Sequence, residues 1–274
     1  MAGAAATDHD GISRMFTRRH EIPMPNIAPL TPRRAPPLDN RLLAGLTRAE
    51  QQRWLPRLTL VDLAPGQVLY ESGSTPAFVY FPCSAIVSLL LLTQDGDSAE
   101  FAVVGNDGMV GISSFMGGSA MPSRAVVQSA GQAWRIAAPL LRQEALGAGP
   151  LLSLLLRYTQ ALIAQVAQTA MCNRYHSIDE RLCRRLLQGL DRSAGSDLHF
   201  TQEGMADLLG VRREGVTAAA LKLQLAGVIR YRRGHIDVLD RQHLERRSCE
   251  CYAAAQRECD RLQPPTGRAQ AIHA

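Results

Sequence analysis

Four polar side chains close together in the last third of the chain could read the edges of DNA base pairs. They are Arg212, Arg213, Glu214 and Thr217. An arginine can donate two hydrogen bonds to the O6 and N7 atoms of guanine, a glutamate can accept one from the N4 amino group of cytosine, and a threonine can contact a base or a phosphate. Such reading requires one rigid element that places these side chains together in the major groove.

The surrounding residues predict such an element, a winged helix-turn-helix over 200–236. Thr201 suits the N-cap of a first helix, and Gly210 suits its left-handed C-cap. A second helix follows and would carry the four side chains. Two short strands then flank a basic turn, which predicts a wing. The strands are expected at 228–231 and 235–238.

Other polar side chains of this segment could contact phosphates, which position a protein on DNA without reading its sequence. The candidates are Thr201, Gln202, Arg232, Arg233 and His235. The alternative interpretation is a small helical core with a solvated basic edge. We favour binding to double-stranded DNA, because the glycine turn, the arginine-led helix and the arginine-tipped hairpin occur together and in this order.

The charge distribution agrees with this interpretation. The formal net charge of the 274-residue chain is only +5. Basic residues outnumber acidic ones by four within 174–247, so most of the excess lies in the segment expected to bind DNA. A basic region of this kind is the electrostatic footprint of a nucleic-acid-binding domain, although a solvated surface could also produce it.

Other classes of protein are disfavoured. The longest apolar run, 85–92, is too short to span a bilayer, and the N-terminus lacks the apolar core of a signal peptide, so we expect a cytoplasmic protein without membrane contact. The chain has no Walker loop and no common hydrolase or zinc-protease motif, so we expect no enzyme. Asp95, Asp97 and Glu100 fit a solvated hairpin turn.

The first half of the chain predicts a β-rich domain. Short β-prone runs alternate with turn residues, as is typical of a barrel, sandwich or jelly roll. The expected strands are 58–63, 67–70, 78–81, 85–92, 99–104, 124–129 and 132–136. Residues 38–60 predict one or two short helices before them, and the proline-rich residues 1–37 predict a disordered extension.

A long helix is expected between the two halves, after Pro150. Its apolar residues fall near a 3-4 repeat, which predicts either an intramolecular core helix or a dimer seam. We favour the dimer seam, because helix-turn-helix proteins usually read DNA as dimers. Ser177 and Glu180 then predict a capping box that starts the next helix. The expected seam residues are Leu151, Leu155, Tyr158, Leu162 and Val166.

This order of elements resembles the Crp/Fnr family of bacterial transcription regulators over roughly 38–244. The most specific similarities are G-V-R-R-E-G-V-T at 210–217, P-G-Q-V-L-Y-E-S-G at 65–73 and G-N-D-G-M-V-G at 105–111. The resemblance implies an α+β fold with an N-terminal jelly-roll-like β-roll sensor domain, a long dimerisation helix and a C-terminal winged helix-turn-helix. The implied divisions are an extension over 1–37, the sensor over 38–138, a linker and dimerisation helix over 139–176, the DNA-binding domain over 177–247 and a tail over 248–274.

The resemblance also implies a homodimer that reads a palindromic site, responds to an effector in or on the roll, and has RNA polymerase as a partner. Arg213 and Glu214 match the family's base-reading pair. The arginine expected one turn later is replaced by Thr217 and Ala218, so either the half-site differs from the family's usual one or Arg212 compensates.

The expected effector pocket departs from that of the cyclic-nucleotide-binding relatives. No glutamate that could hold a ribose lies between Asp107 and Gln143. Ser123 and Arg124 stand in the reverse of the arginine-then-serine order of those relatives, so Arg124 would face the opposite side of its strand. We therefore disfavour cAMP and expect Arg124 to be solvated or ion-paired. Two alternatives stay open, a cyclic-nucleotide- or anion-responsive module and a ligand-independent roll that serves as a scaffold. The candidate pocket residues are Met109, Val110, Gly111, Ser123 and Arg124.

No cofactor or metal site is expected from the histidines and cysteines. No histidine lies within the roll to hold a haem, and the six cysteines match neither a zinc pattern nor the iron–sulfur spacing of relatives. Cys83 and Cys183 suit core positions, and Cys172 could lie near its symmetry mate in a dimer. Cys249, Cys251 and Cys259 follow the wing with His243 nearby, and we expect them in an exposed tail with incidental thiols.

Overall fold

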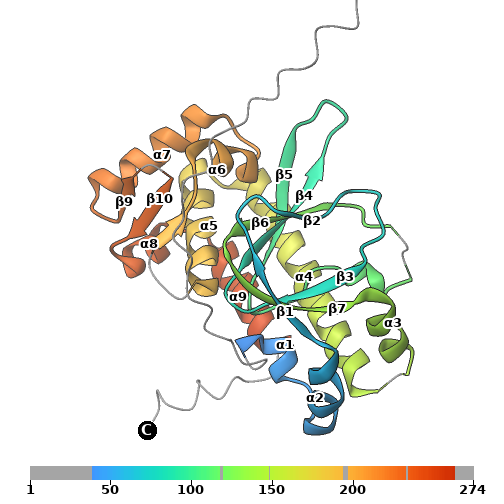
Figure 1. Ribbon diagram of the computed structural model, residues 1–274. Coiled ribbons are helices and arrows are strands. Elements are labelled where there is room, and N and C mark those ends of the chain that lie inside the picture. The colour runs from blue at the N-terminus through green and yellow to red at the C-terminus, as the bar shows by residue number, and fades with distance from the viewer. Residues whose placement is uncertain (1–38, 118–119, 148, 194–196, 233, 263–274) are drawn as a thin grey trace, which may run out of the picture. The chain divides into compact units, whose positions relative to one another are not determined.

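The computed structural model describes residues 39–117, 120–147, 149–193, 197–232 and 234–262 (Figure 1). The expected N-terminal extension, 1–37, and the phosphate-contact candidate Arg233 lie outside these residues. Within them, no helix is both long and apolar enough to cross a membrane.

Two antiparallel sheets form the β-roll (Figure 1). One has the strand order β1-β7-β3 and the other the order β2-β6-β4-β5. Every predicted strand of this half is present, with ends shifted by at most two residues. The strands are β1 (Thr59–Leu63), β2 (Val68–Tyr70), β3 (Phe78–Pro82), β4 (Ile86–Leu92), β5 (Ser98–Val104), β6 (Arg124–Ser129) and β7 (Gly131–Ala137).

Alternation of side chains along these strands builds the roll's core, because every second residue points to the same face of a sheet. Residues from both sheets meet in one buried cluster, which includes Val87 and Leu89 of β4, Val104 of β5, Val127 of β6 and Ala133 of β7. The register of the β4–β5 and β4–β6 pairs shifts at a bulge in each, which bends the sheet.

Helices flank the roll at both ends of its sequence. A second buried cluster joins the N-terminal helices and the helices after β7 to one side of the roll, around Trp54, Phe81 and Leu141. Proline at the start of the long helix α4 is favourable there, because its fixed φ suits the first helical turn. The helices are α1 (Arg41–Ala44), α2 (Arg48–Trp54), α3 (Ala138–Leu146) and α4 (Pro150–Tyr175), with 3-10 turns at Leu55–Arg57 and Ile112–Ser114.

The prediction that one side of α4 faces a partner subunit is wrong for the first three residues named for that side. Leu151, Leu155 and Tyr158 are fully buried within the cluster that joins α4 to the roll. Leu162 and Val166 are half-buried and pack against the roll's own core. The alternative of an intramolecular core face therefore describes this side of α4, because the roll supplies the apolar surface that a second subunit was expected to supply.

The second half of the chain folds around its own core as a winged helix-turn-helix. Leu186, Met205, Val216 and Ile236 lie in that core together with residues from each of the surrounding elements. The three-stranded sheet has the order β8-β10-β9. The elements are α5 (Ile178–Arg192), β8 (Asp197–His199), α6 (Gln202–Leu209), α7 (Arg213–Leu225), β9 (Ile229–Arg232), β10 (His235–Val238) and α8 (Arg241–Arg247).

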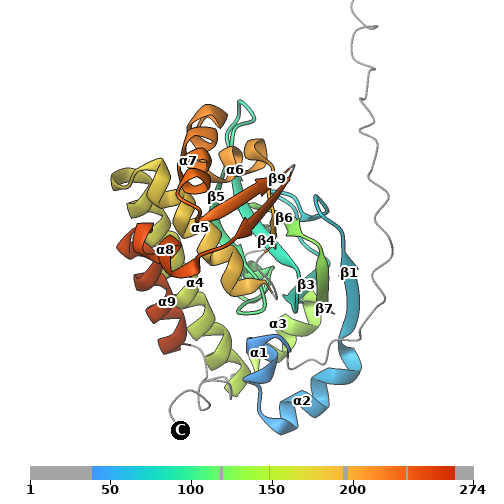
Figure 2. The same cartoon turned by 90° about the vertical axis from the view of Figure 1, so that its left-hand side faces the viewer.

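The segment after the wing is not an exposed tail, which corrects that expectation. Residues Glu250–Leu262 form a helix, α9, that packs along α4 (Figure 2). Cys249 and Cys251 are buried at its start. The expectation failed because this polar helix is amphipathic and has a partner far away in the sequence. Cys83 and Cys183 are buried, which confirms that interpretation.

Candidate nucleic-acid interface

The helix-turn-helix is formed by α6, a tight turn and α7. The Thr201 hydroxyl accepts a hydrogen bond from the Gly204 amide at 2.9 Å and so caps α6, as predicted. Gly210 ends α6 with a φ of 60°, in the left-handed region where glycine is favoured. The Val211 amide donates to the carbonyl of Ala206 at 3.0 Å, which fixes the turn into α7.

Helix α7 buries one face and exposes the other. Val216, Ala219 and Leu223 lie in the domain core. Because these positions recur at helical spacing, the residues between them point outward. All four base-reading candidates lie exposed on the first turns of α7 or directly before it: Arg212, Arg213, Glu214 and Thr217.

Thr217 links the starts of the two helices. Its hydroxyl lies 2.9 Å from Oε1 of Gln202 and 3.0 Å from the carbonyl of Arg213. Thr217, a candidate for base reading, is therefore hydrogen-bonded to Gln202, a candidate for phosphate contact. This bond orients Gln202 beside the exposed end of α7.

The wing adds basic side chains next to this surface. Arg232 is exposed at the end of β9, and His235 is half-buried at the start of β10, where its ring lies 4.2 Å from that of His199. Arg230 is exposed as well and lies two residues before Arg232, so both share one face of β9. Arg230 was missed as a phosphate-contact candidate, although period-two alternation of the strand could have identified it.

A buried ion pair joins this domain to the roll. Nε and Nη2 of Arg185 on α5 lie 2.5 and 2.9 Å from the carboxylate oxygens of Glu100 on β5. Gln128 of β6 also accepts from Arg185. The expectation that Glu100 belongs to a solvated hairpin turn is wrong, because α4 and α6 pack against β5 and Arg185 of α5 pairs with the buried carboxylate.

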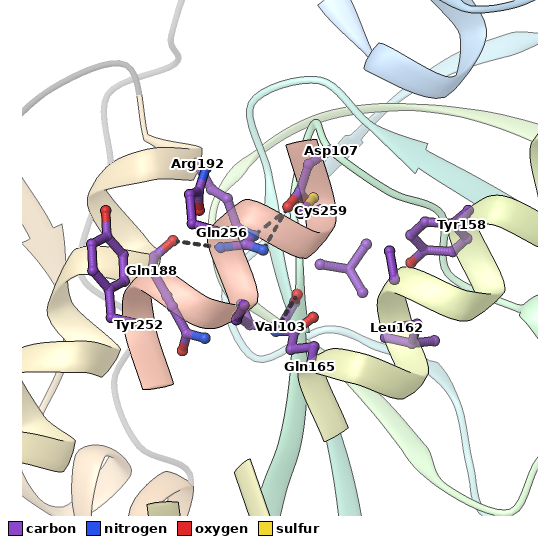
Figure 3. A pocket seen from close by; sticks show the side chains of 13 residues that line it. Val103, Asp107, Tyr158, Leu162, Gln165, Gln188, Arg192, Tyr252, Gln256 and Cys259 are labelled. Carbon is purple, nitrogen blue, oxygen red and sulfur yellow. Dashed lines mark hydrogen bonds and ion pairs between the residues drawn. The ribbon is translucent and has the colours of Figure 1, made fainter. Parts of the chain in front are cut away.

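A second ion pair lies farther along α5 (Figure 3). Nη2 of Arg192 is 2.5 Å from Oδ2 of Asp107, in the glycine-rich segment after β5. Gln165 of α4 donates to the carbonyl of Val103 of β5 at 3.2 Å beside it. The cavity among these side chains has a volume of about 30 Å³, comparable with a single water molecule and too small for a nucleotide. The roll, α4, α5 and α9 all contribute to this junction.

The effector-pocket candidates lie in a well-packed part of the roll. Met109 and Val110 are fully buried, and Val110 exchanges two backbone hydrogen bonds with Tyr80. Gly111 has a φ of 104° and starts a 3-10 turn. These three residues support the roll through packing and backbone geometry.

The other two pocket candidates lie at the start of β6. Ser123 is buried, and its side chain lies beside that of Tyr70. Nε of Arg124 lies 3.1 Å from Glu71 in a partly exposed ion pair, which confirms that this arginine is ion-paired. The Glu71 carboxylate therefore already supplies a counter-charge to Arg124.

Two family models match the chain. The model of the cyclic nucleotide-binding domain matches residues 60–145, and the model of the Crp-like helix-turn-helix domain matches residues 180–247. The chain belongs to the Crp/Fnr family of transcription regulators, with a DNA-binding helix-turn-helix and a cyclic nucleotide-binding-like domain. A search of the curated proteins found none that matches this chain.

Solved structures of this family have the same fold. FixK2 from Bradyrhizobium japonicum is 17% identical with a TM-score of 0.60, over 70% of this chain and 98% of that one. A putative transcriptional regulator of the Crp/Fnr family from Eubacterium rectale is 19% identical with a TM-score of 0.59, over 76% and 97%. The c-di-GMP-responsive global regulator CLP from Xanthomonas campestris is 17% identical with a TM-score of 0.55, over 69% and 97%. The predicted fold class is confirmed.

Proposed function

We propose that the regulator binds a palindromic DNA site as a homodimer and reads each half-site with the exposed start of α7. The single observation that carries this proposal is the outward face of α7, where an arginine, a glutamate and a threonine stand together with nothing of the described chain packed over them. Arg213 and Glu214 would contact base edges, and Arg212 would supplement them.

The wing and the N-cap of α6 would contact phosphates on either side of this helix. Arg230, Arg232 and Thr201 are exposed, and Gln202 is oriented by Thr217. A backbone amide at a helix N-terminus and an arginine are both usual phosphate partners. Such contacts set affinity and salt dependence, whereas α7 sets sequence preference.

The face of α4 opposite to the roll is the proposed dimer seam. Leu156, Ile163 and Met171 are 52, 62 and 53% exposed, which is unusual for large apolar side chains on a helix that otherwise packs well. Ala167 and Ala170 lie on the same exposed side of α4. Leu156, Ile163, Ala167 and Ala170 follow one another at steps of seven, four and three, and Met171 lies four residues after Ala167, which is the spacing of a coiled-coil seam. Two copies joined here would place two α7 helices at two half-sites.

An effector that acts on the roll would reach the DNA-binding domain through the ion pairs of Arg185 and Arg192. The roll's strand β5 and the segment after it hold both carboxylates, so a shift of this strand would move α5. We propose this route for an effector of unidentified chemistry. The Arg124–Glu71 ion pair favours an effector other than cAMP, or a roll that acts only as a scaffold. We also propose RNA polymerase as the protein partner, which transcription in a purified system tests.

Selection from a randomised duplex pool at near-physiological salt, without ligand and then with cAMP, tests the function. Enrichment of a palindrome is expected and would supply the half-site. Enrichment without ligand would support a constitutive or non-nucleotide sensor, and enrichment only with cAMP would overturn the interpretation of the roll. A non-palindromic motif, or none under either condition, would contradict the proposed dimeric reading.

A further inference from the structure

Three cysteines and one histidine converge where α9 meets the end of α4. Cys172 and His176 lie one turn apart at the end of α4, and Cys249 and Cys251 lie at the start of α9. One ligand atom of each, three Sγ atoms and an imidazole nitrogen, lies within 4.8 Å of all the others. We call these four side chains the Cys3His cluster.

The three sulfur atoms are shielded from water. Cys172, Cys249 and Cys251 are 0, 4 and 3% exposed, and together they form a small buried cluster of their own. His176 is 15% exposed at its side chain and closes the cluster toward the surface. Burial alone is also typical of unreactive thiols in a protein core. What distinguishes this cluster is the imidazole nitrogen of His176, which lies beside the three sulfur atoms.

The distances fit four ligands of one small ion. Sγ of Cys172 is 3.5 Å from Sγ of Cys249, and Sγ of Cys251 is 3.6 Å from Nδ1 of His176. Tetrahedral bonds of about 2.3 Å to sulfur and 2.0 Å to nitrogen place neighbouring ligand atoms roughly 3.5–3.8 Å apart. These two separations match those values. The other separations, all within 4.8 Å, would have to shorten by at most about 1 Å for an ion to sit between the four atoms.

The surroundings supply the outer contacts that such a site needs. Nε2 of His176 lies 3.3 Å from the carboxylate of Glu250, so this nitrogen can hold the proton and leave Nδ1 for a metal. The guanidinium of Arg184 lies beside Cys172 and donates to Thr169 at 2.8 Å. Its positive charge would offset part of the negative charge that three metal-bound thiolates would carry.

We propose that the Cys3His cluster binds one Zn²⁺ ion and thereby joins α9 to the end of α4. Three thiolates and one imidazole in a closed tetrahedral arrangement are typical of a structural zinc site. The proposal does not depend on DNA binding. It replaces the expectation, drawn from spacing alone, that these residues hold no metal.

The position of the site suggests what the ion would do. His176 directly precedes Ser177, the N-cap of α5, so one ligand lies at the junction between α4 and the DNA-binding domain. A closed site fixes the backbone of all its ligands. The ion would therefore hold this junction and the start of α9 in one arrangement.

Co²⁺ titration of the full chain, reduced and first stripped with a chelator, tests the site directly. Intense visible absorption with a sulfur-to-cobalt charge-transfer band is expected, saturating at about one ion per chain and abolished by Zn²⁺. Wild-type protein that gives only the weak spectrum of octahedral Co²⁺, or none, would overturn the proposal without recourse to any variant.

Variants then assign the ligands. Cys251→Ser and His176→Ala are expected to lower the affinity for Co²⁺ and Zn²⁺ by at least about 10-fold. Cys259→Ser, on the same helix α9 but outside the cluster, is the matched control and should bind as the wild type does. A wild-type spectrum in Cys251→Ser would show that the ion lies elsewhere and so contradict the site.

A disulfide between Cys172 and Cys249 is the competing chemistry. It would need an oxidant, and it would leave Cys251 and His176 without a role. Thiol counting on protein isolated without reductant distinguishes the two. A reduced chain that binds no Zn²⁺, yet loses two thiols on mild oxidation in the wild type and none in Cys172→Ser, would replace the metal site with a redox pair.

Discussion

Arg185 and Glu100 form a buried, two-point ion pair across the boundary between the sensor and the DNA-binding domain. The arginine belongs to α5 and the glutamate to β5, and both side chains are almost completely buried. Two buried charges are tolerated because each neutralises the other, so neither can be removed without leaving its partner uncompensated. The free energy of unfolding therefore depends on the relative position of the two domains.

Glu100→Gln is expected to lower the free energy of unfolding by about 3 kcal/mol, because the Arg185 charge would stay buried without a counter-charge. Urea unfolding followed by circular dichroism measures this. Arg185→Met in the same chain should recover part of the loss, since it removes the uncompensated charge.

The matched control is an exposed ion pair. Lys222 and Asp179 lie 2.7 Å apart with side chains 62 and 44% exposed, so Asp179→Asn should cost less than about 1 kcal/mol. Equal losses in Glu100→Gln and Asp179→Asn would show that burial of the domain-joining pair contributes nothing special.

Arg213→Ala and Arg232→Ala should separate base reading from phosphate binding. Loss of Arg213 is expected to cost about 1–3 kcal/mol on the selected site and to relax the preference at one position of the half-site. Loss of Arg232 should weaken binding to all sequences alike and make it less dependent on salt. Binding titrations on the selected site and on point-substituted duplexes measure both. A uniform loss on every duplex from Arg213→Ala would remove the base-reading role.

Features set by neighbouring residues could be predicted from the sequence. Ser177 and Glu180 form the expected capping box, and Gly210 has the expected left-handed conformation, because both depend on a few adjacent residues. The strands of the roll were predictable for the same reason, since alternation and turn residues act locally.

Features set by packing between distant segments could not be predicted. The partner of Arg185 lies 85 residues away, and Cys172 meets Cys249 across 77 residues. Helix α4 has apolar residues on two faces, and periodicity alone does not tell which one meets the roll. The five chosen seam residues lie on the face that the roll covers, whereas the exposed face begins with Leu156.

Tyr158→Phe should change how stability depends on alkaline pH. The phenol is buried and donates to the carbonyl of Met109 at 2.8 Å, and burial raises its pKa above the ordinary value of 10.0. Because the folded pKa is raised, the contribution of this tyrosine is fully present below about pH 10 and is lost as pH rises above it. The variant should lose about 1 kcal/mol near pH 8 and show a shallower decline toward pH 11 than the wild type. Urea unfolding across this pH range measures both effects. A free energy of unfolding that falls equally steeply with pH in the wild type and in Tyr158→Phe would contradict the link between this pH dependence and the Tyr158 phenol.

Ile163→Asp should yield monomers if the exposed face of α4 is the dimer seam, because a carboxylate at the centre of an apolar interface cannot be solvated or paired. Sedimentation measures the mass of the particle, and the unfolding transition should stay close to that of the wild type because Ile163 is 62% exposed in the single chain. Leu146→Asp, at a position 79% exposed on α3, is the matched control and should remain dimeric. By contrast, Leu155→Asp should unfold the roll, since that side chain lies in the intramolecular core. A dimer that persists in Ile163→Asp would place the interface on another surface.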